Sequence, residues 1–354
     1  MYMNKNKKKF NEAINDGLIF SLKKDKNLLC YGLGINDPKR TFSTTQNLLE
    51  KFGKKRIFEV PNSENTVMGL AVGAALGDVR SIISHQRLDF FLLAMDQLVN
   101  SAAKWKYMFG RKKSLPITIR LIIGRGWGQG PTHSQNLQSW FNHIPGLKIV
   151  CPANPGNAQQ LLINSIFDPN PVIFIEHRWL HNVYGPVEKP KIEKLGLSRV
   201  YKKGKDITIV SNGYLTLEAI KASEILKSEI GIDVEIIDLN VIKPLNLTLI
   251  LSSIKKTKRL ICLDTGMITG SISSDIVSKV VSKSMKDLKS PPAIIGLPDI
   301  PIPSTYNGAS FYPNYKNIII KVKKIFNVKK KINKNHFKLD GPIDVPGNWF
   351  KGPF

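Results

Sequence analysis

The chain reads RIFEVPNSENTVMGLAVGAALGDVRSIIS from residue 56 to residue 84. Two short runs rich in strand-forming residues, 56–60 and 80–84, flank the glycine- and alanine-rich segment 66–77. The middle segment predicts a helix whose small side chains leave a smooth surface for close packing. Strand, helix and strand in this order favour a mainly parallel sheet with helices on its faces.

The same alternation continues along the chain. Further β-rich runs, separated by segments of helical spacing such as residues 92–105, lie at residues 117–123, 148–150 and 172–175. Residues 187–206 are rich in lysine, proline and glycine and lose this periodicity, which is typical of a linker. A second α/β set follows, with strands predicted at residues 207–210, 234–238, 260–264 and 293–297 and helices at 216–228, 246–255, 271–284 and 315–326.

We therefore predict an α/β protein with two doubly wound domains. The predicted boundaries are residues 1–190 for the first domain, 191–205 for the linker, 206–330 for the second domain and 331–354 for a basic segment and C-terminal tail. A chain of 354 residues exceeds what one hydrophobic core usually serves, and a hydrophobic content of 42% is ample for two cores.

The chain is strongly basic, with 52 Lys and Arg against 27 Asp and Glu, a net charge of +25. Such a charge could attract nucleic acid, acidic lipid or an anionic protein. The excess is mostly lysine scattered along the chain, without the arginine clusters that grip phosphates, so we favour compositional drift. The densest basic run, residues 321–338, predicts the solvated face of a last helix followed by a tail.

Cysteine usage and hydropathy predict a cytoplasmic protein. Cys30, Cys151 and Cys262 are more than a hundred residues apart, which suggests neither a disulfide framework nor a zinc knuckle. The apolar segment 17–22 is too short for a signal-peptide core. No run approaches the roughly twenty apolar residues of a membrane span.

The segment VPNSENT, residues 60–66, places Glu64 where a strand ends and a helix begins. In open α/β folds this carboxyl edge of the sheet is where ligands bind. The alternative is a first-turn glutamate that only complements the helix dipole.

The loop GRGWGQGPTHS, residues 124–134, follows an apolar strand and is rich in glycine. It contains neither G-x-G-x-x-G nor G-K-[ST], which argues against a nucleotide-binding loop. What remains is a loop that presents His133, whose imidazole suits proton transfer near neutral pH, or else a histidine that is merely solvated.

Two weaker patterns carry no prediction of a metal site. His177 and His181 have i, i+4 spacing but lack the glutamate of a zincin and an evident third ligand. Asp78 and Asn100 are spaced somewhat like a magnesium and diphosphate motif, but Val79 stands where that motif needs glycine.

The order of these motifs resembles the β subunit of the thiamine-diphosphate-dependent 2-oxoacid dehydrogenase family, in the transketolase-like superfamily, from about Thr41 to Phe354. The stretches that carry the resemblance are NSE at 62–64, LLAMDQLVNSAAK at 92–104, GPTHSQ at 130–135, IPGLK at 144–148, NPVIFIEH at 170–177 and DVPGNWFKGPF at 344–354. The resemblance implies a transketolase-like pyrimidine-binding domain followed by a transketolase C-terminal domain.

The resemblance also implies roles for four residues. Glu64 matches the glutamate that hydrogen-bonds ring nitrogen N1′ of thiamine diphosphate, Phe90 matches the aromatic residue that packs on the pyrimidine, and Gln86 lines the same pocket. His133 matches the histidine that faces the reactive carbon of the cofactor and assists acyl transfer to a lipoyl group. For Phe90 the alternative is an ordinary core residue.

A structural potassium ion held by backbone carbonyls is implied near four further residues: Ile117, Ser165, Asp168 and Asn170. The motif for magnesium and diphosphate belongs to the α subunit of this family, so the chain is expected to be inactive alone. The implied assembly is an α₂β₂ heterotetramer with its active sites at α/β junctions, and a lipoyl acyltransferase is the further partner that the resemblance suggests. The substrate class is a 2-oxoacid of open identity.

Alternatives remain at this point. The chain could be half of a split transketolase or deoxyxylulose-phosphate synthase acting on sugar phosphates, or a non-catalytic basic protein that binds nucleic acid, although no nucleic-acid module is recognisable. Arg87 departs from many relatives, which carry an uncharged residue there. It either reads a carboxylate or phosphate of an unusual substrate or points to the surface.

Overall fold

The computed structural model describes residues 6–110, 112–126, 128–304, 310–338, 346–347 and 349–350. These residues form two compact units, the first with residues 6–125, 132–196 and 350 and the second with the rest. The change of unit after Gly196 falls inside the predicted linker, residues 191–205. Much of the predicted segment 331–354, namely residues 339–345, 348 and 351–354, lies outside the described residues.

The first unit is built on a parallel sheet in which β5 is central. The strands lie in the order β6 (Lys148–Val150), β7 (Val172–His177), β5 (Ile117–Ile123), β4 (Ser81–His85), β2 (Leu29–Gly32) and β3 (Ile57–Glu59). Every residue of β4, β5 and β7 is buried, as expected for parallel strands covered on both faces. The predicted runs 117–123 and 148–150 coincide with β5 and β6.

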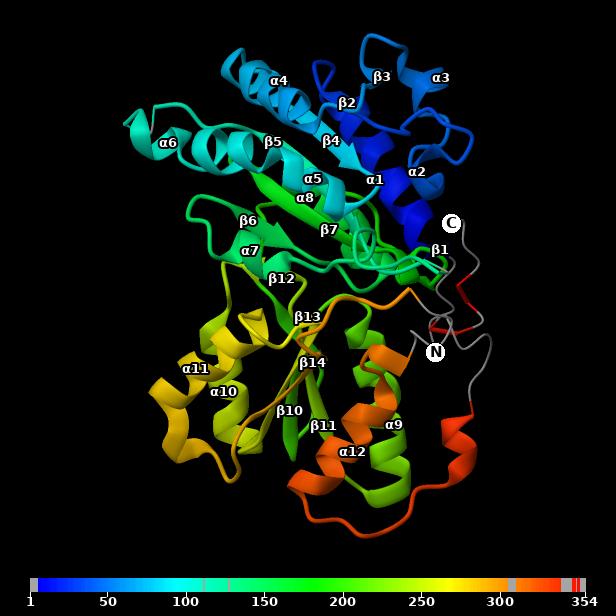
Figure 1. Ribbon diagram of the computed structural model, residues 1–354, viewed down its shortest axis with the longest axis vertical. Coiled ribbons are helices and arrows are strands. Elements are labelled where there is room, and N and C mark those ends of the chain that lie inside the picture. The colour runs from blue at the N-terminus through cyan, green and yellow to red at the C-terminus, as the bar shows by residue number, and fades with distance from the viewer. Residues whose placement is uncertain are drawn as a thin grey trace. The chain divides into compact units, whose positions relative to one another are not determined.

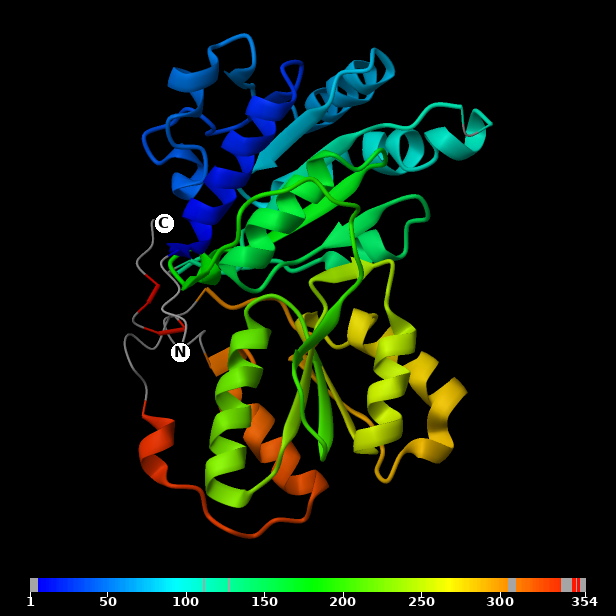
Figure 2. The same cartoon turned by 180° about the vertical axis from the view of Figure 1, so that it is seen from behind.

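Helices cover both faces of this sheet. On one face α1 (Phe10–Lys24) packs against α8 (Pro155–Ile166), as Figure 2 shows. On the other face lies α4 (Glu64–Leu76), beside the helical segments that follow β4 (Figure 1). The remaining short elements of the unit are β1 (Lys7–Lys9), α2 (Arg40–Ser43, a turn with positive φ throughout), α3 (Leu48–Phe52), α7 (Gln138–Asn142), η3 (Arg178–Leu180) and β8 (Tyr184–Pro186).

The single helix predicted over residues 92–105 is divided. The structure has α5 (Leu88–Phe91), a 3₁₀ turn η1 (Leu92–Ala94), a π-helical segment η2 (Gln97–Ala102) and α6 (Trp105–Met108). In the π segment, Ala103 N donates to Leu98 O at 2.9 Å, a bond that spans five residues instead of four. The apolar spacing that predicts a helix does not reveal such a widened turn.

The second unit repeats the α/β layering. Its sheet order is β14 (Ala293–Leu297), β13 (Leu260–Met267), β10 (Ile207–Ser211), β11 (Val234–Asp238) and β9 (Arg199–Lys202). Helices α9 (Leu215–Ile230) and α12 (Tyr315–Ile325) lie on one face, and α10 (Leu247–Thr257) and α11 (Ile272–Ser284) on the other (Figures 1 and 2). The short elements are β12 (Val241–Lys243), η4 (Met285–Asp287) and η6 (Lys334–Phe337).

One strand of the second unit falls where the sequence predicts only a linker. β9 pairs antiparallel with β11, whereas the other pairs in this sheet are parallel. Arg199 and Tyr201 are exposed, as is common in an edge strand that has sheet on only one side. Such a strand needs little apolar patterning, which is why periodicity does not predict it.

The basic run 321–338 begins on α12, as predicted. The helix buries Tyr315, Ile318, Ile319 and Val322, and its lysines lie on the remaining surface. No helix in the described part of the chain is both long and apolar enough to cross a bilayer.

Candidate active site

Glu64 opens a hollow at the carboxyl edge of the first sheet. It is the first residue of α4, in the segment that follows the end of β3 at Glu59, and Ser63 immediately before it has an extended φ of −155°. The hollow is formed by residues that follow β2 and β3, lie on α4 or follow β4: Leu33, Val60, Pro61, Glu64, Val67, His85, Gln86 and Phe90. The structure thus brings together Glu64, Gln86 and Phe90, which the resemblance assigns to one cofactor.

The hollow suits one side of a flat heteroaromatic ring. Most of its lining side chains are apolar, and three are polar: Glu64, His85 and Gln86. Its volume is only about 10 Å³, roughly the room for one water molecule. These residues fit an aminopyrimidine, with apolar walls for the ring and polar atoms for its edge, but this surface alone does not enclose a ring.

Glu64 also satisfies the alternative interpretation, since a first-turn carboxylate interacts favourably with the α4 dipole. The two roles are compatible. Within the described residues, no side chain or backbone amide donates a hydrogen bond to the Glu64 carboxylate, so its oxygens can accept from a ligand.

Gln86 is held against the loop that follows β2. Its Nε2 donates to Asp37 Oδ2 at 3.3 Å. The loop can approach the Gln86 side chain because residue 34 is glycine. A Cβ there would lie 1.6 Å from Gln86 Nε2, and the φ of +74° would strain any residue with a side chain. The carboxylate of Glu59 accepts hydrogen bonds from the amides of Gly34 and Asn36 and fixes this turn.

His133 lies beside the aromatic wall of the hollow. Its ring meets that of Phe90 edge to face, with centroids 5.4 Å apart and planes at 88°. The loop is fastened by Gln135, whose backbone N and side-chain Nε2 donate to Asp89 Oδ1 at 3.3 and 2.9 Å. Thr132 Oγ1 is 3.0 Å from His133 Nδ1, and the imidazole is otherwise exposed. The structure therefore places His133 next to Phe90 with its ring open to solvent.

His85 lines the same hollow and was not singled out from the sequence. It is the last residue of β4, only 6% exposed, and its ring lies 4.9 Å from that of Phe91. Burial lowers the pKa of His85 to about 4, so the ring is neutral at neutral pH. The sequence did contain a signal for His85. This histidine directly follows the predicted strand 80–84, which places it at the same sheet edge as Glu64.

Arg87 points inward, so the prediction of a surface-pointing side chain is wrong. It is 4% exposed, and its Nη1 donates to Gly124 O at 2.7 Å. Its guanidinium lies 5.9 Å from the ring of Phe42, and that of Arg178 lies 4.4 Å from the same ring.

His177 and His181 do not share a helix face. His177 ends β7, whereas His181 follows a short 3₁₀ turn, with Nε2 3.4 Å from Glu176 Oε2. Burial, then His181 and Arg87, lower the pKa of His177 to about 3. Among the described residues no group of three or more His, Cys, Asp or Glu is arranged to hold a metal ion.

Glu176 forms a buried ion pair with Arg120. Nε and Nη2 of Arg120 both lie 2.7 Å from Glu176 Oε1, and the arginine also donates to Ser84 Oγ at 3.1 Å and Thr44 Oγ1 at 2.9 Å. Burial alone would raise the pKa of Glu176, but Arg120 and His181 lower it below its ordinary value. This pair ties β5 to β4 and β7 beneath the site.

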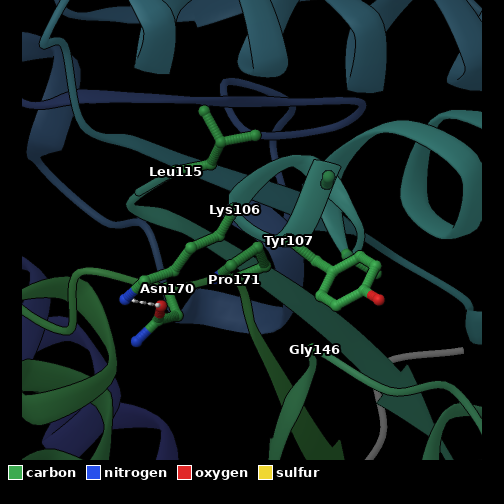
Figure 3. A pocket seen from close by; sticks show the side chains of 8 residues that line it. Lys106, Tyr107, Leu115, Gly146, Asn170 and Pro171 are labelled. Carbon is green, nitrogen blue, oxygen red and sulfur yellow. Dashed lines mark hydrogen bonds between the residues drawn. The ribbon is translucent and has the colours of Figure 1, made fainter. Parts of the chain in front are cut away.

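The residues implied for potassium lie at one end of β5 and on the connection from α8 to β7: Ile117, Ser165, Asp168 and Asn170. The pairing of Thr118 with Val172 brings these two regions together. Beside them is a cavity of about 210 Å³ (Figure 3), lined by Ala102, Ala103, Lys106, Tyr107, Leu115, Gly146, Asn170 and Pro171.

Two lysines donate hydrogen bonds to side-chain oxygens of this connection. Lys148 Nζ donates to Asp168 Oδ2 at 2.5 Å, and Lys106 Nζ reaches Asn170 Oδ1 at 3.3 Å, as Figure 3 shows. Ser165 O accepts from Asp168 N at 3.2 Å. The ligands implied for potassium are backbone carbonyls, so these side-chain contacts do not test the site, and it stays a prediction.

Known proteins resemble this chain over most of its length. The transketolase pyrimidine-binding domain family matches residues 6–182, and the transketolase C-terminal domain family matches residues 196–318. A split gene transketolase, described as an inactive β4 tetramer, superposes with a TM-score of 0.69 over 91% of this chain and 99% of its own, at 19% identity. At that identity the likeness shows the fold alone, and it agrees with the two α/β domains predicted.

Curated relatives are closer in sequence. The pyruvate dehydrogenase E1 component subunit beta of Rickettsia bellii is 34% identical over 90% of this chain and 98% of its own length. The same subunit of Bacillus subtilis is 31% identical over 89% and 97%, and that of Rhizobium meliloti is 35% identical over 89% and 69%. With two matched domains and relatives above 30% identity, the chain belongs to the transketolase-like family that includes the β subunits of pyruvate dehydrogenase E1 components.

Proposed function

We propose that this chain is the β subunit of a thiamine-diphosphate-dependent 2-oxoacid dehydrogenase component, which decarboxylates a 2-oxoacid and transfers the acyl group together with an α subunit. The observation that carries the proposal is the hollow in which Glu64, Gln86 and Phe90 meet at the carboxyl edge of the sheet. Family membership supports the same chemistry.

Glu64 would hold the cofactor through the edge of its pyrimidine ring. A carboxylate suits this position because it can keep a proton on a weakly basic ring nitrogen in a sheltered site. Phe90 would pack on the ring, and Gln86, held by Asp37, would line its edge. When bound, thiamine diphosphate supplies the nucleophilic carbon and the electron sink for decarboxylation.

His133 would serve the acyl-transfer step. Its imidazole is exposed and has ring nitrogens that can donate or accept a proton, and the Gln135–Asp89 bonds keep it beside Phe90. An acyl acceptor such as a lipoyl group could reach an exposed ring, so we include a lipoyl acyltransferase among the proposed partners.

A separate α subunit is part of the proposal, in an α₂β₂ assembly. The hollow on this chain is shallow, and Val79 replaces the glycine of the magnesium and diphosphate motif, so another chain must hold both. We include a structural potassium ion held by backbone carbonyls near Ile117, Ser165, Asp168 and Asn170 as a further part of the proposal. The cytoplasm is the proposed compartment, since Cys30, Cys151 and Cys262 are buried thiols that form no disulfide among the described residues.

The test is to co-express the chain with the product of the neighbouring reading frame and to assay the purified pair. We expect 2-oxoacid-dependent reduction of an artificial electron acceptor that needs thiamine diphosphate and magnesium and is absent from either chain alone. A stable pair that is inactive on every 2-oxoacid tested but converts sugar phosphates would favour the split transketolase. Salt-dependent binding of arbitrary DNA without turnover would favour the basic binding protein.

Two variants separate the catalytic role of Glu64 from its dipole role. Glu64→Gln should lower turnover roughly 10²- to 10⁴-fold, the usual worth of one positioned acid or base. Glu12→Gln is the matched control, because Glu12 is an exposed first-turn glutamate of α1. It should keep full activity. Equal activity of the two variants would leave Glu64 with a dipole role only.

A further inference from the structure

His85 is the third polar side chain of the hollow, and the proposed function does not use it. It ends β4 with 6% of its surface exposed, on the strand face that also carries Ile83. Its Nε2 is buried and has no hydrogen-bond partner among the described residues. Glu64 and Gln86 line the same small space.

The large majority of buried side-chain polar atoms are hydrogen-bonded, because leaving one without a partner destabilises the folded state. Among the described residues whose side chain has a buried atom without a hydrogen-bond partner, His85 is the one that lines the hollow. A phenylalanine at this position would keep the edge contact with Phe91 and would carry no such penalty. The imidazole therefore destabilises the free chain, and a ligand in the hollow can supply the partner that it lacks.

The chemistry of the ring limits what that ligand can be. Burial keeps His85 neutral, since its pKa is about 4. A neutral imidazole has one donor and one acceptor nitrogen and adds no charge. It suits a polar atom on the edge of a heteroaromatic ring better than a phosphate or a carboxylate, which would favour a charged partner.

We propose that His85 is a cofactor-binding residue, whose Nε2 hydrogen-bonds a polar atom on the edge of the aminopyrimidine ring held by Glu64. This inference rests on the proposed function and adds a second polar contact to it. His85 is the last residue of β4 and Glu64 the first of α4, so the two contacts would hold the ring from different elements.

The experiment compares His85→Phe, His85→Gln and a control, His143→Phe, which changes an exposed histidine. The dissociation constant of thiamine diphosphate is measured by calorimetry on each assembled αβ pair with magnesium, and urea unfolding is followed on each full-length β chain. We expect His85→Phe to weaken binding about fivefold, which is about 1 kcal/mol at 1.4 kcal/mol per tenfold.

The same variant should unfold at an equal or higher urea concentration than the wild type, because the unpartnered nitrogen is gone. His85→Gln should recover at least half of the lost affinity, and His143→Phe should change neither quantity. A purely structural histidine would instead give a less stable His85→Phe chain with an unchanged dissociation constant.

The outcomes distinguish this inference from the proposed function. If the wild-type pair binds thiamine diphosphate and Glu64→Gln weakens it, but His85→Phe stays within a factor of 1.5 of the wild type, the role of His85 is overturned and the proposed function stands. If the wild-type pair binds no thiamine diphosphate, both are overturned.

Discussion

His85 should make the folded chain sensitive to acid, and replacing it with phenylalanine should remove part of that sensitivity. Burial lowers its pKa from 6.5 to about 4. As the pH falls below 6.5 the unfolded chain binds a proton at this residue and the folded chain does not. At this residue the free energy of unfolding therefore does not depend on pH above pH 6.5, and it falls on acidification towards pH 4. Between pH 6.5 and pH 5 the loss is about 2 kcal/mol, at 1.36 kcal/mol per pH unit.

The assay is urea unfolding of the full chain at pH 7 and pH 5, followed by circular dichroism, for the wild type and His85→Phe. Other buried groups, such as His177 and Glu176, titrate in both proteins and cancel in the comparison. We expect the wild type to lose about 2 kcal/mol more than the variant between the two pH values. Equal losses would refute the argument that burial holds this ring neutral.

Three substitutions test other parts of the first unit. Glu176→Gln leaves the buried guanidinium of Arg120 without its carboxylate and should lower the free energy of unfolding by about 3–5 kcal/mol, measured in urea; a loss below about 1 kcal/mol would contradict the ion pair. Gly146→Ala should lower the thermal midpoint, with a loss of about 1–3 kcal/mol, because φ is +92° and a Cβ would lie 2.0 Å from Ala103 O; an unchanged midpoint would contradict that close approach. Asn154→Ala should cost about 1 kcal/mol by removing the cap of α8, whereas Asn154→Asp should retain it.

Most strands inside the two sheets could be predicted because they are rich in apolar and β-branched residues, although β2 was not predicted. Residues 117–123, 234–238 and 293–297 are strands with the predicted bounds, and each is bounded by residues that break the apolar run. A strand buried between two helical layers needs only its own sequence to be recognised.

Features that depend on partners in space were harder to predict. β9 is an edge strand held by backbone bonds to β11, and its short sequence with basic residues at Arg199 and Lys202 looks like part of a linker. The π segment Gln97–Ala102 keeps the apolar spacing of an ordinary helix. Arg87 lies after an apolar strand, and only the fold shows that its guanidinium points inward and donates a hydrogen bond to Gly124 O.

The candidate site follows from the register of the parallel strands. Gly32 of β2 lies opposite Glu59 of β3 and Ser84 of β4, so these neighbouring strands end at the same height. The residues that come next, Leu33, Val60 and His85, must therefore converge on one point, which is where Glu64 begins α4. A glutamate that served only the helix dipole would need no such convergence. Glu64 lines one hollow together with residues at the ends of three strands, and this arrangement, more than the identity of any one residue, favours a ligand in the hollow.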